Sequence, residues 1–177
     1  MHSYERAGML REKAIAYAYH LREKARGIPV RNRAGENERW NAYKKVATAF
    51  LASAGETGAT SRERSEYYRI AAEAFLILEE YAQAARAFEK ASKFTEAAQN
   101  YRHAGMFDDT VSIIKNHGAV MDSSVAETLT NVARYYYLER GDLKYNPPFL
   151  SSSGYLTHQT IGKHRLCSLM PKRSWNL

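Results

Sequence analysis

The chain of 177 residues has few of the features that stabilise secreted proteins or carry a chain across a membrane. Its single cysteine, Cys167, excludes an internal disulfide and suits a reducing compartment. Apolar runs such as residues 74–78 are far shorter than the roughly 20 residues that a membrane-spanning helix needs. The N-terminal sequence MHSYERAGML has no apolar stretch of signal-peptide length. We therefore expect an intracellular protein with no membrane partner, in either the cytoplasm or the nucleus.

Acidic residues are absent from the last part of the chain, and the net charge of +7 is unevenly distributed. Residues 1–45 have a net charge of +6, residues 46–143 of −4 and residues 144–177 of +5. The middle of the chain is therefore mildly acidic between two basic flanks. Basic flanks attract polyanions, so nucleic acid is one candidate partner.

A set of residue types recurs every 13 residues between Tyr68 and His117. Each unit opens with a large residue, has small residues three and four places on, and has a second large residue seven places on. These offsets lie on one face of a helix, so each unit is predicted to be a short amphipathic helix whose paired small residues are buried at helix crossings. The repeat positions are Tyr68, Ala71, Ala72, Phe75, Tyr81, Ala84, Ala85, Phe88, Phe94, Ala97, Ala98, Tyr101, Phe107, Val111 and Ile114.

Helices this short are marginal in water on their own, so the units must stack on one another. The sequence therefore predicts an all-α protein, built as an antiparallel helical-hairpin solenoid. The turns between the units are expected near residues 79–80, 92–93 and 105–106, and Gly118 is expected to close the last unit.

The segment before the repeats contains a partial copy of one unit. Residues 4–10 match residues 101–107 at the aromatic residue, the Ala-Gly pair and the methionine, so Gly8 is expected to end a helix as Gly105 does. A new helix should then run from Leu10 to about Arg26, with Ala14, Tyr17, Ala18, Leu21 and Ala25 on its inner face. A chain that opens on the second half of a repeat unit is expected to be a fragment.

Three further helices are predicted outside the repeats. Residues 31–35 should form a loop before a helix whose inner pattern runs from Trp40 to Leu51. The next helix should begin at Thr60, which forms a capping-box pattern with Glu63. Ser124 with Glu127 is a second such pattern, and it should open the last helix, which ends near Arg140.

The residues after Lys144 have a different character. Pro147 and Pro148 disfavour a helix, a serine-rich stretch follows, and no amphipathic period is visible in residues 145–177. We expect a helical repeat domain over residues 1–144 and a basic, disordered tail over residues 145–177.

The tail contains two patterns that are typical of ligand sites, but neither is complete. Gly162-Lys163 resembles the end of a phosphate-binding loop but lacks the earlier glycine and the following Ser or Thr. His158, His164 and Cys167 are three candidate metal ligands without a fourth. We therefore predict no cofactor-binding and no metal-binding residue.

Candidate catalytic groups in the helical region have a simpler structural interpretation. His103 and His117 lie near helix ends, where capping or packing is the expected role, and the acidic pairs 79–80 and 108–109 lie at helix boundaries. In the run Tyr135 to Tyr137, packing in the core is the expected use of the last two tyrosines, rather than base stacking. No catalytic residue is assigned, and the chain is predicted not to be an enzyme.

The Tyr-x-x-Ala-Ala-x-x-Phe units and the Ala-Gly-Met junctions resemble tetratricopeptide-like solenoids, including those of vesicle-fusion attachment proteins. The segments at residues 4–9, 67–73, 94–98 and 132–136 are similar to the helical-repeat region of large fungal UvrD-like (superfamily 1) helicases related to tetratricopeptide-and-ankyrin-repeat proteins. The resemblance covers roughly residues 1–144, and none of the ATP- or nucleic-acid-binding residues of such helicases has a counterpart in it.

This resemblance implies a non-catalytic scaffold or protein-interaction module from a larger helicase-type protein. Its partner would then be another protein or another domain of the parent chain. The alternative is an accessory module that binds nucleic acid through its basic flanks. A steep loss of affinity with rising salt would distinguish the alternative from protein binding.

Overall fold

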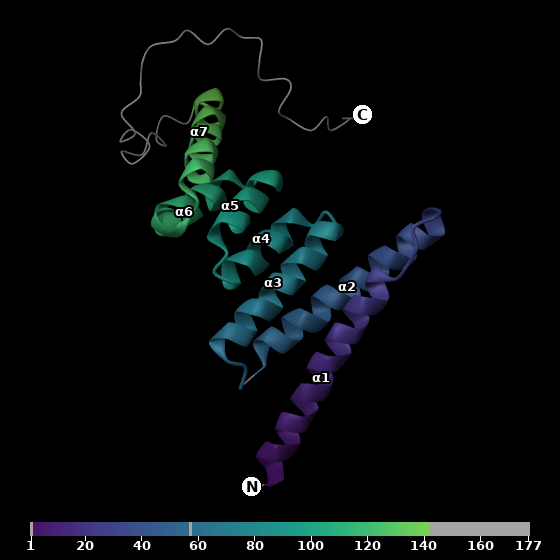
Figure 1. Ribbon diagram of the computed structural model, residues 1–177. Helices are drawn as coiled ribbons and strands as arrows, with labels where there is room; N and C mark the ends of the chain where they lie inside the picture. The colour runs from purple at the N-terminus through teal and green to yellow at the C-terminus, as the bar shows by residue number, and fades with distance from the viewer. Residues whose placement is uncertain (1, 57, 142–177) are drawn as a thin grey trace. The chain divides into compact units, whose positions relative to one another are not determined.

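The computed structural model describes residues 2–56 and 58–141, and the side chains within them from Gly8 onward. Every regular element in these ranges is a helix, as the sequence predicted (Figure 1). The elements are α1 (His2–Arg26), α2 (Arg33–Gly55), α3 (Ser61–Ile77), α4 (Tyr81–Lys90), α5 (Phe94–His103), α6 (Phe107–His117), the 3-10 helix η1 (Gly118–Val120) and α7 (Ser123–Glu139). None of these helices is long and apolar enough to span a membrane.

Each helix packs mainly on its neighbours in the chain, so contacts run in order from α1 to α7 (Figure 1). An additional contact joins α5 to α7. The helices fall into two groups by length. The helices α1, α2, α3 and α7 have 25, 23, 17 and 17 residues, whereas α4, α5 and α6 have 10, 10 and 11. The short helices are below the length at which an isolated helix is stable, so their stability depends on packing.

The turns between the short helices share one geometry at the predicted period. Glu79, Ser92 and Gly105 have positive φ values of 57°, 58° and 74°. The residue after each donates its backbone N–H to the carbonyl five positions earlier, at 3.0, 2.9 and 2.9 Å. This left-handed closure satisfies carbonyl groups at the helix end and reverses the chain. The predicted turn positions are therefore confirmed.

Two helix starts show how side chains cap the backbone. The Thr60 hydroxyl accepts from the Glu63 N–H at 3.2 Å, and the Glu63 carboxylate accepts from the Thr60 N–H at 2.8 Å, which confirms the predicted capping box. The capping box predicted for Ser124 and Glu127 is wrong. The N-cap is Asp122, two residues earlier, and its carboxylate accepts from the N–H groups of Ser124 and Val125 at 3.0 and 3.1 Å. With the cap at Asp122, the Glu127 N–H lies inside the helix and needs no side-chain acceptor.

Gly8 does not end a helix, because α1 continues through it from His2. A reversal there would have to bury the residues that follow, yet Met9 and Leu10 are 58% and 62% exposed. Continuing the helix costs about 1 kcal/mol for the glycine but keeps the backbone hydrogen bonds. Gly118 does end α6 as predicted, and its φ of −55° leads the chain directly into the 3-10 helix η1.

The loop before α2 is shorter than the sequence predicted, because residues 33–35 of the predicted loop belong to the helix. Helix α2 begins at Arg33, and the Asn32 side chain caps it by accepting from the Gly35 N–H at 2.9 Å. A side chain at Gly35 would place its Cβ 2.7 Å from the Pro29 carbonyl oxygen, so glycine allows this close approach. The glycine therefore serves packing inside a helix rather than a turn.

The predicted boundary at residue 144 and the tail over residues 145–177, with His158, Gly162, Lys163, His164 and Cys167, lie outside the described residues.

Candidate protein-interaction surface

The repeat positions form the interior of the helix stack. Their six paired alanines are all 0% exposed: Ala71, Ala72, Ala84, Ala85, Ala97 and Ala98. The large residues at the end of each unit are buried as well: Phe75, Phe88, Tyr101 and Ile114. Small residues at a crossing let two helix backbones approach closely, and the large residues then fill the space beside them. These positions form the core of the helix stack and are not exposed at its surface.

The aromatic residues that open the units lie at the edge of the stack, half-buried. Each contacts a residue at or near the end of the following helix. Tyr68, for example, contacts Lys90 at the end of α4, and the Lys90 ammonium lies 5.4 Å from the Tyr68 ring centre. Tyr81 packs on His103 with ring centres 5.5 Å apart, and the ring centres of Phe94 and His117 are stacked at 3.7 Å. The two histidines therefore have the packing role that their positions predicted.

The last unit is closed by the tyrosines of α7. The Tyr136 ring stacks on Phe107 at 4.0 Å, and the Tyr137 hydroxyl donates to the Asp108 carboxylate. Asp108 and Asp109 occupy the first turn of α6, where a negative charge interacts favourably with the positive end of the helix dipole. Within the described residues, no group of three or more His, Cys, Asp or Glu side chains could hold a metal ion.

Helix α1 is attached to the loop between α2 and α3 by one arginine. The Arg11 guanidinium donates to the Gly58 carbonyl at 2.7 Å and to the Glu63 carboxylate at 2.8 Å. The pKa of Glu63 is lowered by the backbone N–H of Thr60, then by the Thr60 hydroxyl, and then by Arg11. The carboxylate therefore belongs to the capping box first and to the ion pair second.

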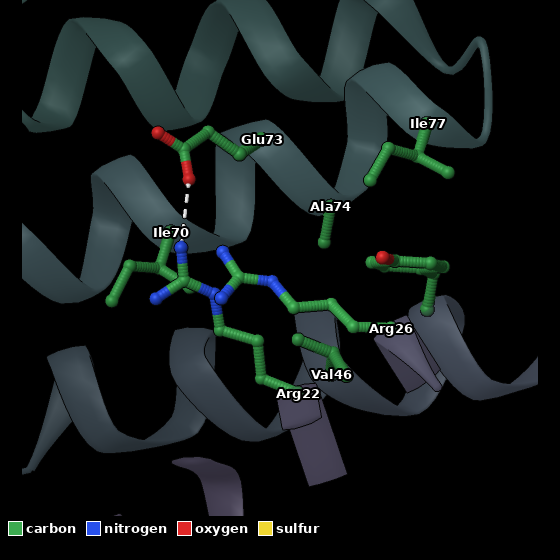
Figure 2. A pocket seen from close by; sticks show the side chains of 8 residues that line it. Arg22, Arg26, Val46, Ile70, Glu73, Ala74 and Ile77 are labelled. Carbon is green, nitrogen blue, oxygen red and sulfur yellow. Dashed lines mark hydrogen bonds and ion pairs between the residues drawn. The ribbon is translucent and has the colours of Figure 1, made fainter. Parts of the chain in front are cut away.

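A small pocket of about 40 Å³ lies between α1, α2 and α3, lined by Arg22, Arg26, Val46, Ile70 and other residues (Figure 2). The figure shows the Arg22 guanidinium pointing at Glu73, and their N–O distance is 3.2 Å. Glu73 also accepts from Arg69 within α3. A space of this size holds water but not an organic substrate. The ion pair therefore holds α1 on α3 beside this small pocket.

Large apolar side chains are exposed mainly on α1, α2 and α3 and in the loop between α1 and α2. They are Met9, Leu10, Tyr17, Tyr19, Val30, Trp40 and Ile77. In the described chain no large apolar residue of α4, α5 or α6 is exposed, and Val120 and Leu138 follow them. Exposed apolar residues that lie together, as Val30, Trp40 and Ile77 do in the pocket described below, are typical of interaction sites.

Two of these exposed residues correct the sequence interpretation. Tyr17 and Trp40 were placed on the inner faces of their helices, but they are 60% and 41% exposed. The apolar face of each helix is wider than the strip that its described neighbours cover. A periodic pattern gives the direction of such a face but not the number of helices that pack on it.

A shallow pocket of about 480 Å³ lies where the beginning of α2 meets the end of α3. Its apolar wall consists of Val30, Trp40, Ile77 and Leu78, and its polar residues are Glu36, Arg39 and Glu79. Trp40 also contacts Lys44, whose ammonium lies 5.0 Å from the indole ring centre. The wall can accept an apolar side chain.

The arginine in this pocket has an unused hydrogen-bond donor. The Arg39 guanidinium lies 5.6 Å from the Tyr43 ring centre, and its Nε is buried without an acceptor among the described residues. A buried donor without a partner is costly, and a bound chain could not reach this Nε while it stays buried. Any polar contact to a bound chain would therefore come from other polar atoms of Glu36, Arg39 and Glu79, which lie beside the apolar wall as in small protein-binding sites.

Comparisons with protein-family models, curated proteins and solved structures found no match to this chain.

Proposed function

We propose that this chain is a non-catalytic helical-repeat scaffold that binds a partner protein through the exposed apolar surface of α1–α3. The observation that carries this proposal is the concentration of exposed large apolar side chains on α1–α3 and their absence from α4, α5 and α6. Exposed apolar surface has an unfavourable hydration free energy, and burial against a partner removes that cost.

The two parts of the chain have different roles in this proposal. The buried alanine pairs of α4 and α5 hold these helices close together and give a stable support. Helices α2 and α3 then present Trp40, Ile77 and Arg39 in one pocket. Tryptophan and arginine are among the residues that contribute most to binding when they become fully desolvated.

The arrangement of consecutive packed helices with a repeated turn supports a tetratricopeptide-like solenoid. The similarity of residues 4–9 and 67–73 to UvrD-like helicases supports an origin in the repeat region of such a protein. Under this proposal ATP hydrolysis belongs to other domains, and the purified chain has none. Helicase motifs in the same reading frame upstream would support this origin, and their absence would contradict it.

A photo-crosslinking amino acid at position 40 tests the interaction role. We expect it to capture a defined protein from cell extract, whereas the same amino acid at Asn131, an exposed polar position on α7, should not. The captured protein is then purified, and its affinity is measured for the wild-type chain and for Trp40→Ala. A loss of at least tenfold supports the proposal. Equal labelling from both positions, or equal affinity of both chains, would overturn it.

The charge of residues 1–45, a net +6, favours one alternative function, the binding of nucleic acid. Its signature is an affinity for single- or double-stranded oligonucleotides that falls steeply between about 50 and 200 mM salt. Binding to the captured protein that changes little over the same range supports the scaffold instead.

A further inference from the structure

Helix α1 contacts α2 through a face centred on Ala18 and Ala25, both 0% exposed. Arg11 and Arg22 lie on one side of this face, since they bind carboxylates of α3 at 2.8 and 3.2 Å. Successive residues of a helix are about 100° apart, so the opposite side of the face can be identified from the sequence. That side has no described helix beside it.

Four residues form an apolar flank on this uncovered side of α1: Leu10, Ala14, Tyr17 and Leu21. Leu10 and Tyr17 are 62% and 60% exposed, whereas Ala14 and Leu21 are partly buried at the inner edge of the flank. Leu21 also packs against the core, so the flank continues from the interior of the protein to its surface.

The flank has the same spacing as the buried faces of the repeat helices. Leu10, Ala14 and Tyr17 occupy offsets 0, 4 and 7, as Phe107, Val111 and Ile114 do in α6. In the repeats this combination of large and small residues packs against other helices, and Val111 and Ile114 are buried. The corresponding flank of α1 therefore has the shape that accepts a helix rather than a loop or a small molecule.

The charges beside the flank indicate the composition of that helix. Lys13 occupies the offset where the repeats have alanine or threonine, and Lys24 lies on the same outer edge. Neither lysine forms an ion pair with the residues that the structure describes. Glu12 and Glu23 lie on another side of α1, where Glu23 pairs with Arg26 at 3.0 Å. The edge of the flank is therefore positive.

We propose that the flank of α1 formed by Leu10, Ala14, Tyr17 and Leu21 docks an acidic amphipathic helix of a partner protein. This inference names the class of partner for the scaffold proposed above and rests on that proposed function. The apolar face of the partner helix covers Leu10 and Tyr17. Its carboxylates meet Lys13 and Lys24, which are separated by roughly 16 Å along the helix axis.

The test uses the full chain and synthetic peptides of 18 residues with capped ends. The acidic probe has leucine at positions 3, 7, 10 and 14, glutamate at the positions that border them, and alanine elsewhere. A basic peptide replaces each glutamate with lysine, and a scrambled acidic peptide spreads the leucines over all faces. Binding is measured by fluorescence anisotropy, and circular dichroism shows that each variant remains helical.

Two double variants address the two parts of the site. Leu10→Ser with Tyr17→Ser removes the apolar contacts, and Lys13→Glu with Lys24→Glu reverses the charge. The matched control is Met9→Ser, because Met9 is 58% exposed but lies on the side of α1 opposite α2. A second control is Trp40→Ala, which alters the pocket at α2 and α3 and leaves α1 unchanged.

We expect the acidic probe to bind the wild-type chain and both control variants equally, and each double variant to bind it at least tenfold more weakly. The charge-reversed variant should instead prefer the basic peptide. Equal binding of the scrambled peptide, or unchanged affinity in both double variants, would overturn the inference. So would a wild-type chain that dimerises through this flank, or one that binds phosphatidylserine vesicles but not the acidic probe. If only Trp40→Ala abolishes binding, this inference fails while the proposed scaffold function stands.

Discussion

The first three helices, α1–α3, and the three short ones, α4–α6, have similar apolar patterns but differ in how fully these are covered. In α1–α3 the interior contains large residues, of which Phe50, Ile70 and Val46 are at most 1% exposed. In α4 and α5 the centre of each packed face is a pair of alanines at 0% exposure, as it also is at Ala71 and Ala72 of α3. Close packing of small residues completes the interior of the short helices, whereas the wide faces of the long helices leave apolar residues at the surface. A repeated pattern therefore predicts a packing face but not how fully it is covered.

The largest effect is expected at the centre of the long helices. Phe50 packs edge-on against Tyr19 at 5.1 Å and beside Tyr67 at 6.1 Å between ring centres. Phe50→Ala should lower the free energy of unfolding by about 3 to 5 kcal/mol, because it removes a buried ring and leaves a cavity. Urea unfolding followed by circular dichroism measures this change. The control Met9→Ala, at an exposed site, should change stability by less than about 0.5 kcal/mol.

The second prediction concerns the short helices, where a substitution destabilises by adding volume at a tight helix crossing rather than by leaving a cavity. Ala85→Leu or Ala98→Leu should destabilise the protein by about 1 to 3 kcal/mol, because a larger side chain at a helix crossing forces the backbones apart. Thermal melting provides the measurement. Ala52→Leu, at an exposed position of α2, is the matched control and should melt like the wild type. Unchanged melting of both buried variants would mean that the crossings are not tightly packed.

The repeat and its turns could be predicted from the sequence because their causes are local or periodic. Thr60 and Glu63 satisfy each other's backbone groups within one helical turn, and the 13-residue period fixes which face of each short helix is buried. Neither conclusion needs knowledge of distant residues.

Other features could not be predicted because they depend on which helices are neighbours. Gly8 has the same sequence context as Gly105, but only Gly105 adopts a positive φ. Tyr17 corresponds to the buried Ile114 in the repeat pattern and yet is exposed. The candidate site was missed for the same reason, since Val30, Trp40 and Ile77 come together only through the packing of α2 and α3.

The turns allow a finer comparison between equivalent positions. Gly105→Ala should destabilise by about 1 kcal/mol, since alanine is strained at φ of 74° although no atom lies within 4 Å of the added Cβ. Ser92→Gly should stabilise by about 0.5 kcal/mol, because it relieves the strain of a serine at φ of 58° but increases the entropy of the unfolded chain.

Chemical unfolding of the two variants beside the wild type gives both values. Gly118→Ala serves as the control for loss of a glycine, because Gly118 has a negative φ and should tolerate alanine better than Gly105 does. A destabilised Ser92→Gly would show that the serine side chain contributes more than its backbone strain costs.

The smallest change in stability is expected at the start of α3, where the Glu63 carboxylate binds both Thr60 and Arg11 of α1. The pKa of Glu63 is held below its ordinary value of 4.5 in the folded protein, chiefly by the Thr60 N–H. A group with a lowered folded pKa contributes stability above its unfolded pKa and loses it as the pH falls through the folded value. The stability difference between the wild type and Glu63→Gln should therefore be largest near pH 7 and should shrink as the pH falls below about 4.5. Unfolding in urea across this pH range measures the difference.

The control is Arg11→Met, which should keep most of the pH dependence, because the Thr60 hydrogen bonds are the larger cause of the lowered pKa. High salt should for the same reason change the pH dependence of the wild type little. If Arg11→Met instead removes the whole pH dependence, the ion pair to α1, and not the capping box, controls the ionisation of Glu63.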